Sequence, residues 1–146
     1  MINWLQYLVL IFLILVSFID LKKRTLPSPL TTSAIFVVAI VNIENLPFGI
    51  LAGILGWLLT DFYKDDYSNV FSGLSDLKMT VLLGLMVSNI NAFLLFTFLL
   101  VFFGVAYKII IVKFFPKEKE IAFIPVFLII FIVMILVEVF TNVKIF

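Results

Sequence analysis

Long stretches without a charged side chain restrict the fold of this chain more than any other feature. The first of them, residues 3–19, contains no Asp, Glu, Lys or Arg. A helix rises about 1.5 Å per residue, so this run crosses most of a hydrocarbon core that is about 30 Å thick. No Lys or Arg precedes the run and no small-residue cleavage site follows it, so we expect a retained helix and not a secretory signal. The chain is 64% hydrophobic, whereas soluble domains are about half apolar, so its expected environment is a membrane.

Five further apolar runs follow, and together with the first they predict an all-α, polytopic membrane protein. These runs cover residues 30–43, 47–60, 77–88, 92–115 and 121–143. We predict a single transmembrane domain over residues 1–146, built as a bundle of about six transmembrane helices. Its expected cytoplasmic loops are residues 20–29, 61–75 and 116–120. The second and third runs are short and are joined by a turn next to Pro47, which is typical of a tight hairpin or a re-entrant pair.

The positive charges predict how the bundle is oriented, because Lys and Arg concentrate in short cytoplasmic loops. If the first run ends in the cytoplasm, nine of the ten cations lie on that side: Lys22, Lys23, Arg24, Lys64, Lys78, Lys108, Lys113, Lys117 and Lys119. Only Lys144 then lies outside. This division predicts a multi-pass protein of the cytoplasmic membrane with its N-terminus and C-terminus outside. The net charge of +1 gives no indication of a nucleic-acid partner.

Carboxylates are the groups left for catalysis, because the chain contains no Cys and no His. Thiolate and imidazole metal sites, Cys nucleophiles and a His general base are thereby excluded. Asp20 ends the first apolar run and Asp76 stands just before the fourth, so both belong to the cytoplasmic side. Two carboxyls held close together share one proton and supply a general acid and a general base, which can activate water for peptide hydrolysis. The alternative is that each Asp only ends a helix at the membrane surface, where a charge costs little.

Short motifs surround these two carboxylates. The first begins at Asp20 and continues through a basic segment to the triplet LPS at residues 26–28, and the second is GLSDLKM at residues 73–79. A weaker third is IAFIP at residues 121–125, before the last run. In this order the motifs resemble those of the GxGD-type aspartyl membrane proteases, specifically the prepilin and preflagellin peptidases (class III signal peptidases) in their short archaeal form. The chain departs from the family at Ser75, which replaces the second glycine of the motif.

The resemblance implies an aspartyl endopeptidase that removes the short basic leader from type IV pilin-like or archaellin precursors. It implies cleavage at the cytoplasmic membrane face by Asp20 and Asp76, with the supporting motif residues Pro27, Gly73, Ser75 and Lys78. We expect no metal, no cofactor and no methyltransferase activity, since the Cys-rich insertion of bacterial members is missing. Lys78 either interacts with the Asp76 carboxyl or extends its ammonium group to the membrane surface. The loop acids either attract the cations of the leader or face solvent: Asp61, Asp65 and Asp66.

Two other functions are compatible with the same residues. A small transporter or channel subunit uses intramembrane acids to bind cations or relay protons. A non-catalytic assembly subunit keeps the fold and lacks activity because of Ser75. Glu138, in the sixth run, is an acid within a span, and we expect a hydrogen-bonded role or a place near the outer interface. Membrane lipid is an expected contact under each of these functions, and the sequence makes no prediction of oligomeric state.

Overall fold

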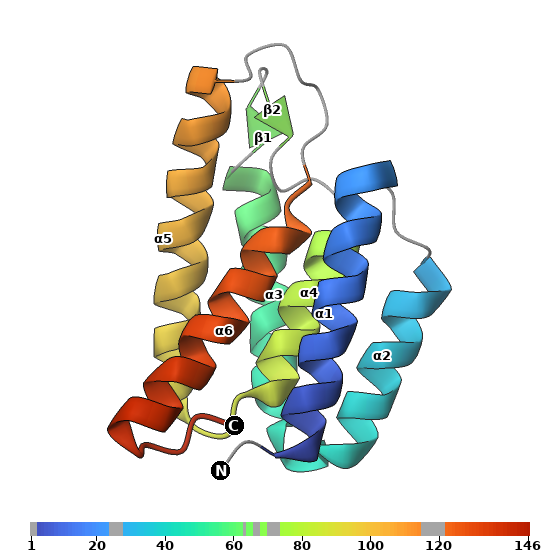
Figure 1. The fold of residues 1–146 in the computed structure, drawn as a ribbon, viewed down its shortest axis with the longest axis vertical. Coiled ribbons are helices and arrows are strands. Elements are labelled where there is room, and N and C mark those ends of the chain that lie inside the picture. The colour runs from blue at the N-terminus through green and yellow to red at the C-terminus, as the bar shows by residue number, and fades with distance from the viewer. Residues whose placement is uncertain (1–2, 24–27, 63, 66–67, 70–73, 115–121) are drawn as a thin grey trace.

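The computed structural model describes residues 3–23, 28–62, 64–65, 68–69, 74–114 and 122–146. In these ranges six α-helices form one bundle (Figure 1). They are α1 (Trp4–Lys23), α2 (Ser28–Val41), α3 (Leu46–Phe62), α4 (Leu74–Met86), α5 (Ile90–Phe114) and α6 (Ile124–Thr141). The 3-10 helix η1 (Ile43–Asn45) precedes α3, and the two-residue strands β1 (Lys64–Asp65) and β2 (Ser68–Asn69) pair antiparallel after it. The predicted all-α fold class is confirmed, with this short ladder as an addition.

The helices differ in whether they can cross a membrane alone. Within the described ranges, three segments are long and apolar enough: Trp4–Lys22, Ile90–Ile110 and Ile124–Thr141. The segments Ser28–Val41 and Ile43–Leu59 pass the same test only together, and they are bent by 105° at their junction. This bend agrees with the re-entrant alternative for the second and third runs. Six apolar runs thus correspond to six helices, of which three have the length of a span, or up to four if the bent pair counts as one.

The helix ends differ from the predicted boundaries by a few residues, and two of the larger differences concern an Asp. α1 continues through Asp20 to Lys23, because Leu and Lys are good helix formers and sustain the helix beyond the apolar run. α4 begins at Leu74, so Asp76 lies in its first turn. Both carboxylates therefore project from regular helical turns and not from loops.

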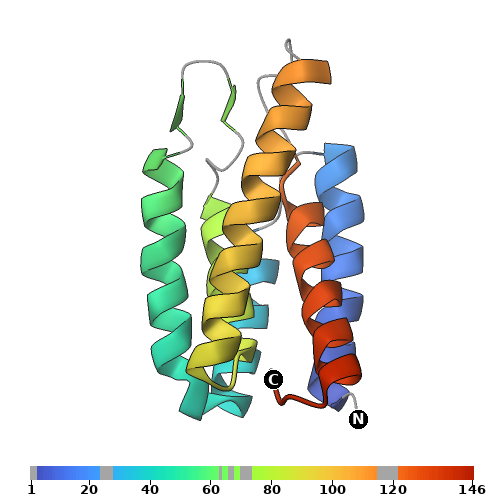
Figure 2. The same cartoon turned by 90° about the vertical axis from the view of Figure 1, so that its left-hand side faces the viewer.

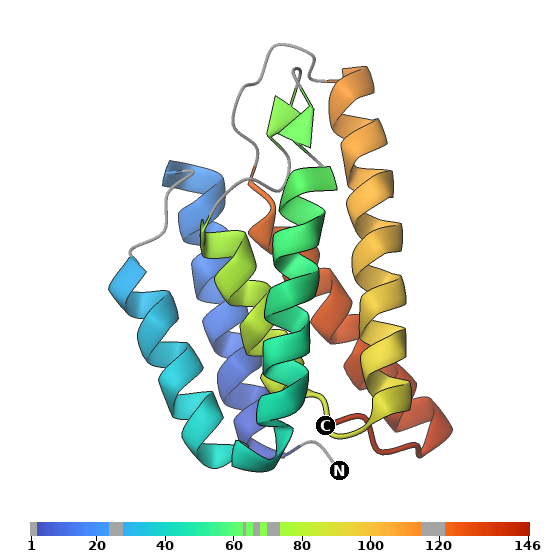
Figure 3. The ribbon, with the colours of Figure 1, turned by 180° about the vertical axis from the view of Figure 1, so that it is seen from behind.

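The central helix of the bundle is α4, which contacts α3, α2 and α6. Eight of its 13 residues are buried, including Asp76. Figure 3 shows α4 between α1 and α3, and Figure 2 shows α6 between α5 and α1. At about 1.5 Å per residue, α4 is only about 20 Å long, and the neighbouring helices bury most of it. Buried side chains from all six helices form one hydrophobic cluster.

Small residues allow α3 and α4 to pack closely. A Cβ added at Gly84 of α4 would lie 2.4 Å from Cβ of Ala52 and 2.8 Å from the backbone oxygen of Phe48. A Cβ added at Gly49 of α3 would lie 2.6 Å from Cδ2 of Leu85. Small residues spaced along one face are a common device for close helix contact in membranes. Here they hold the helix that carries Asp76.

The two ends of the bundle contain different parts of the chain. At one end, which we call the site end, α1 terminates and α4 and α6 begin; at the other, the distal end, α1 begins and the chain returns after α6 (Figure 1). The return starts at Asn142, whose left-handed conformation (φ 54°) ends α6. The tail then reaches the α4–α5 junction, where Ser88 N donates a hydrogen bond to Ile145 O at 2.9 Å. Ile145 is buried there, so the tail covers the distal end of the core.

Candidate functional site

The two carboxylates singled out by the sequence are both buried. Asp20, in the last turn of α1, is 7% exposed, and Asp76, in the first turn of α4, is 8% exposed. Among the described residues these are the charged side chains that the fold buries. The helix ends that carry them, the end of α1 and the start of α4, lie toward the site end of the bundle (Figures 1 and 3). An Asp that only marks the membrane surface would remain in contact with water, so burial favours the other interpretation of these residues.

The carboxylate of Asp20 contacts the start of α6. Its Oδ2 accepts a hydrogen bond from the backbone N–H of Ile124 at 3.1 Å, although the two residues are 104 positions apart in the chain. Ile124 is the first residue of α6 and Pro125 follows it. The first N–H groups of a helix have no partner within the helix, and its positive end interacts favourably with a carboxylate. The weak third motif, at residues 121–125, therefore ends beside the first catalytic candidate.

Aromatic packing holds the segment before α6 in place. Tyr107 of α5 donates its hydroxyl to Ala122 O at 2.7 Å. The ring of Phe123, which is buried, lies edge-on to Tyr107 at 5.8 Å and to Phe127 at 5.4 Å between ring centroids. Such pairs are favourable beyond the apolar area that they bury. The N–H that binds Asp20 thus comes from a backbone with little freedom to move.

Asp76 is positioned by the most buried helix of the bundle. One turn further along α4, the hydroxyl of Thr80 donates to the backbone oxygen of Asp76 at 2.9 Å, and Thr80 is fully buried. Across the interface, Gly56 of α3 leaves room for this hydroxyl, since a Cβ there would lie 3.3 Å from Thr80 Oγ1. Ser75, which replaces the family glycine, is half-buried in the first turn of α4. The helical backbone at Ser75 is one that any L-residue adopts.

Lys78 connects α4 to α2. Its Nζ donates to Ser28 Oγ at 2.6 Å, to Thr32 Oγ1 at 2.8 Å and to Ser28 O at 3.4 Å. All the described hydrogen bonds of this ammonium group go to the first turns of α2 and none goes to a carboxylate. Lys78 therefore fixes the start of α2 beside the first turns of α4. The residue just before α2, Pro27 of the first motif, lies outside the described residues.

Several other predicted site residues cannot be placed around the carboxylates. Gly73 and Asp66 lie outside the described residues. Asp61 is in the last turn of α3 and Asp65 is in β1, and both elements reach the site end of the bundle. Their side chains lie outside the described part of the structure. Leader binding by these acids stays a prediction. No group of three or more Asp, Glu, His or Cys side chains suited to a metal ion occurs within the described residues.

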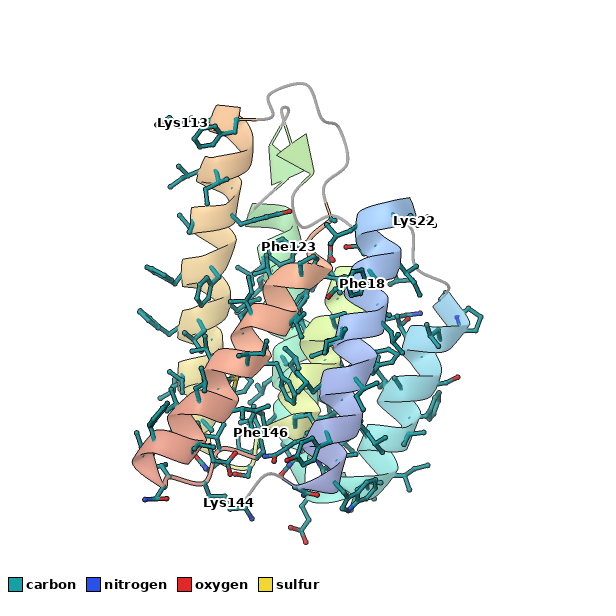
Figure 4. All side chains as sticks on the ribbon, in the orientation of Figure 1. Phe18, Lys22, Lys113, Phe123, Lys144 and Phe146 are labelled. Carbon is teal, nitrogen blue, oxygen red and sulfur yellow. The ribbon has the colours of Figure 1, made fainter. Side chains whose placement is uncertain are left out.

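Charged side chains lie at both ends of the bundle. Lys22 and Lys113 lie at the site end and Lys144 at the distal end (Figure 4). Glu138, near the end of α6, accepts a hydrogen bond from Gln6 Nε2 at 3.0 Å. The expected hydrogen-bonded role of Glu138 is confirmed. This acid is far along α6 from the Asp20 contact and does not belong to the same site.

Sequence reasoning missed one polar residue of this region, Ser17. Its side chain is 4% exposed, and its hydroxyl has no hydrogen-bond partner within the described residues. It lies three residues before Asp20 on α1. The signal that could have indicated it is this spacing, which places both side chains on one helix face.

The site end of the bundle thus holds two buried carboxyls and a buried hydroxyl. Carboxyls in a poorly solvated setting are suited to proton transfer, as general acid and general base, and to activating water. No protein-family model, curated protein or solved structure matches this chain.

Proposed function

We propose that the chain is a membrane aspartyl endopeptidase that uses Asp20 and Asp76 as an acid–base pair. The observation that carries the proposal is the burial of both carboxyls at the same end of the bundle. Burying an ionisable side chain in an apolar core is unfavourable, and intramembrane acids commonly mark functional sites. The two acids are also the ones that stand in the motifs resembling the GxGD-type proteases.

In the proposed reaction, water attacks the scissile carbonyl between the two carboxyls. The ionised carboxyl takes a proton from the water as its oxygen bonds to the carbonyl carbon, and the protonated carboxyl gives its proton to the carbonyl oxygen. Collapse of the tetrahedral intermediate then breaks the C–N bond: the carboxyl that took the water proton gives it to the leaving amine, and the other carboxylate takes back the hydroxyl proton of the intermediate. The hydrogen bond from Ile124 N to Asp20 Oδ2 holds one of the two carboxyls in position for these steps.

The proposed substrates are type IV pilin-like or archaellin precursors, with the basic leader in the cytoplasm and the apolar helix in the bilayer. This requires the site end to face the cytoplasm, with about six spans and both termini outside. Lys22 and Lys113 at the site end and Lys144 at the distal end support that orientation (Figure 4). The beginning of α1 and the end of the chain share the distal end, which agrees with an even number of crossings (Figure 1). Asp61, Asp65 and Asp66 are proposed to attract the leader's cations.

A cleavage assay with purified protein and a leader-bearing precursor tests the proposal. Asp20→Asn and Asp76→Asn should each abolish cleavage while the protein still inserts and folds. Glu44→Gln is the matched control, because Glu44 is exposed at the distal end and should be replaceable without effect. The reaction should be indifferent to chelators and to serine and cysteine reagents. Substantial processing by either Asn variant would contradict the proposal.

Two outcomes would favour the other functions. Ion flux into liposomes that depends on Asp76, with no cleavage of any precursor, would indicate a transporter. A parent protein without cleavage activity would indicate an assembly subunit, and cleavage gained by Ser75→Gly would show that the serine is the cause.

A further inference from the structure

Ser17 differs from most helical hydroxyls in the described part of the chain. There, six other Ser and Thr hydroxyls donate to a backbone carbonyl three or four residues earlier in their own helix: Thr31, Thr32, Ser33, Thr80, Thr97 and Thr141. This local bond is the usual way for a helix to satisfy a hydroxyl in an apolar environment. The equivalent carbonyl for Ser17 belongs to Leu13, one turn earlier, but the Ser17 hydroxyl makes no such bond.

The cost of leaving this hydroxyl unbonded is raised by its burial. Ser17 is 4% exposed. Among the buried side-chain oxygen and nitrogen atoms of the described residues, its Oγ is the one that makes no hydrogen bond. Buried polar groups are almost always bonded, and an exception indicates a functional group or a bound partner. The hydroxyl thus keeps an unused capacity for hydrogen bonding inside the bundle.

The position of Ser17 indicates which molecule that is. Residues three apart on a helix lie on the same face, and every Cα–Cβ bond tilts toward the N-terminus of the helix. The Asp20 side chain therefore leans back over the turn that carries Ser17. The buried residues of α1 before this point, Val9, Leu13 and Val16, lie along the same inward stripe. Ser17 is thus the polar residue of this stripe that lies directly below the Asp20 carboxyl.

We propose that Ser17 is a third hydrogen-bond partner of the water that the two carboxyls activate, an inference that rests on the proposed peptidase function. A buried water typically makes about three hydrogen bonds, and Asp20, Asp76 and Ser17 supply three polar groups. Ser17 Oγ accepts one O–H of the water, and the ionised carboxyl accepts the other. This arrangement directs a lone pair of the water at the scissile carbonyl. Ser17 itself neither gains nor loses a proton during the reaction.

A simpler role for Ser17 is that of a small residue that lets α1 pack closely against its neighbours. The two roles differ in what they require of Ser17→Ala. Alanine is as small as serine and is a better helix former, so close packing survives the substitution. The hydroxyl does not. A packing residue thus tolerates the change, whereas a partner of the reacting water does not.

The experiment compares the parent, Ser17→Ala and Thr97→Val in the precursor cleavage assay. Thr97→Val is the matched control, because it removes a helical hydroxyl that already bonds to its own helix. For Ser17→Ala we expect kcat to fall by about 10- to 100-fold, in the range of a lost proton-transfer or water-positioning contact. KM should stay within about twofold, since the water is not part of substrate binding. Thr97→Val should cleave like the parent.

Several kinetic results would overturn the inference while leaving the proposed function intact. These are an unchanged kcat, a loss confined to KM, or a shift of either limb of the pH–rate profile, which would show that Ser17 acts on a carboxyl and not on water. Thermal unfolding followed by circular dichroism should show that Ser17→Ala is as stable as the parent. If it is less stable and kcat falls only in proportion to the folded fraction, the role is structural and the inference fails. An inactive parent would instead contradict the peptidase proposal itself.

Discussion

The site end and the distal end of this bundle use polar side chains in opposite ways. At the distal end, amide side chains bond to backbone carbonyls: Asn42 Nδ2 and Asn45 Nδ2 both donate to Leu85 O at 3.2 Å, and Asn89 Nδ2 donates to Lys144 O at 2.7 Å. At the site end, the fold buries two carboxyls, of which Asp20 accepts a hydrogen bond from Ile124 N, and it also buries the Ser17 hydroxyl, which has no hydrogen-bond partner within the described residues. The distal end thus satisfies the carbonyls that helix ends leave free, whereas the site end keeps groups that are expensive to bury.

This difference separates stability from reactivity within one small protein. Groups that complete the hydrogen bonds of helix ends stabilise the fold and are chemically inert. Buried acids destabilise a fold and are retained where their reactivity is needed. Substitutions at the two ends should therefore have opposite effects. At the site end they should lower cleavage activity and leave the stability of the fold unchanged, and at the distal end they should lower stability and leave activity unchanged.

The largest effect expected from the comparison is that of Asp76→Asn. Cleavage should fall by about 10³-fold or more, as is usual when one member of a catalytic pair is lost, which corresponds to roughly 4 kcal/mol in the barrier. Because the amide has no charge to bury, the thermal midpoint should stay the same or rise. Cleavage rates and thermal unfolding would be measured on the same preparation. A large loss of stability would show that Asp76 is a structural residue and would remove the contrast between the two ends.

Next in size is Gly84→Ala, a substitution in the packing between α3 and α4. The new Cβ would lie 2.4 Å from Ala52 Cβ and 2.8 Å from the backbone oxygen of Phe48, and a backbone atom cannot easily move away. Overpacking of this kind costs about 1–3 kcal/mol, so the thermal midpoint should fall by several degrees. Gly53→Ala is the matched control, since its Cβ would meet only Val81 Cγ2 at 3.2 Å. Equal stability of both variants would show that the close approach of the helices is not needed.

The helices of this fold could be predicted from the sequence to within a few residues. Apolar runs report helix positions well, because each helix must hide its backbone and apolar side chains within a single continuous segment. The boundaries were less accurate at Asp20 and Asp76, where helix propensity extends the helix beyond the apolar run. The central position of α4 among the other helices was not predictable, since its apolar run resembles that of a helix that faces lipid.

The contacts of the site depend on parts of the chain that are far apart, so the sequence predicts its residues but not its geometry. Both acids could be selected from their motifs and from the lack of Cys and His. The bond from Ile124 N to Asp20 joins residues 104 positions apart, and only packing of α1 against α6 brings them together. Ser17 is a lone hydroxyl inside an apolar run, and nothing in its neighbours indicates that it lacks a bond to its own helix. The direction of Lys78 toward α2 likewise follows from the packing of α2 on α4.

A smaller effect is expected for Lys78→Met, which tests whether the site end also contains a purely structural contact. The substitution removes the donated bonds to Ser28 and Thr32 and keeps most of the apolar stem. Hydrogen bonds from a charged donor contribute about 1.5–3 kcal/mol when buried and less here, because Lys78 is only half-buried, so we expect a loss of about 1 kcal/mol. Lys113→Met, at an exposed position of the same end, should have no effect. Full stability combined with lost cleavage would instead make Lys78 part of the reaction.

The smallest effect is expected at the distal end, for Asn42→Ala and Asn45→Ala. Both side chains donate to the same acceptor, Leu85 O, which lies at the C-terminal end of α4 where carbonyls have no partner within the helix. Removing one amide leaves the other in place, so each single variant should lose only about 0.5 kcal/mol, near the mean for hydrogen bonds measured within membrane proteins. The double variant leaves the carbonyl without either donor and should lose more than the sum of the two. Thermal unfolding of the parent, the two single variants and the double variant measures the coupling energy between the two amides. Cleavage should be unchanged in all four proteins. A drop in kcat for either single variant would mean that the two ends of the bundle are not independent.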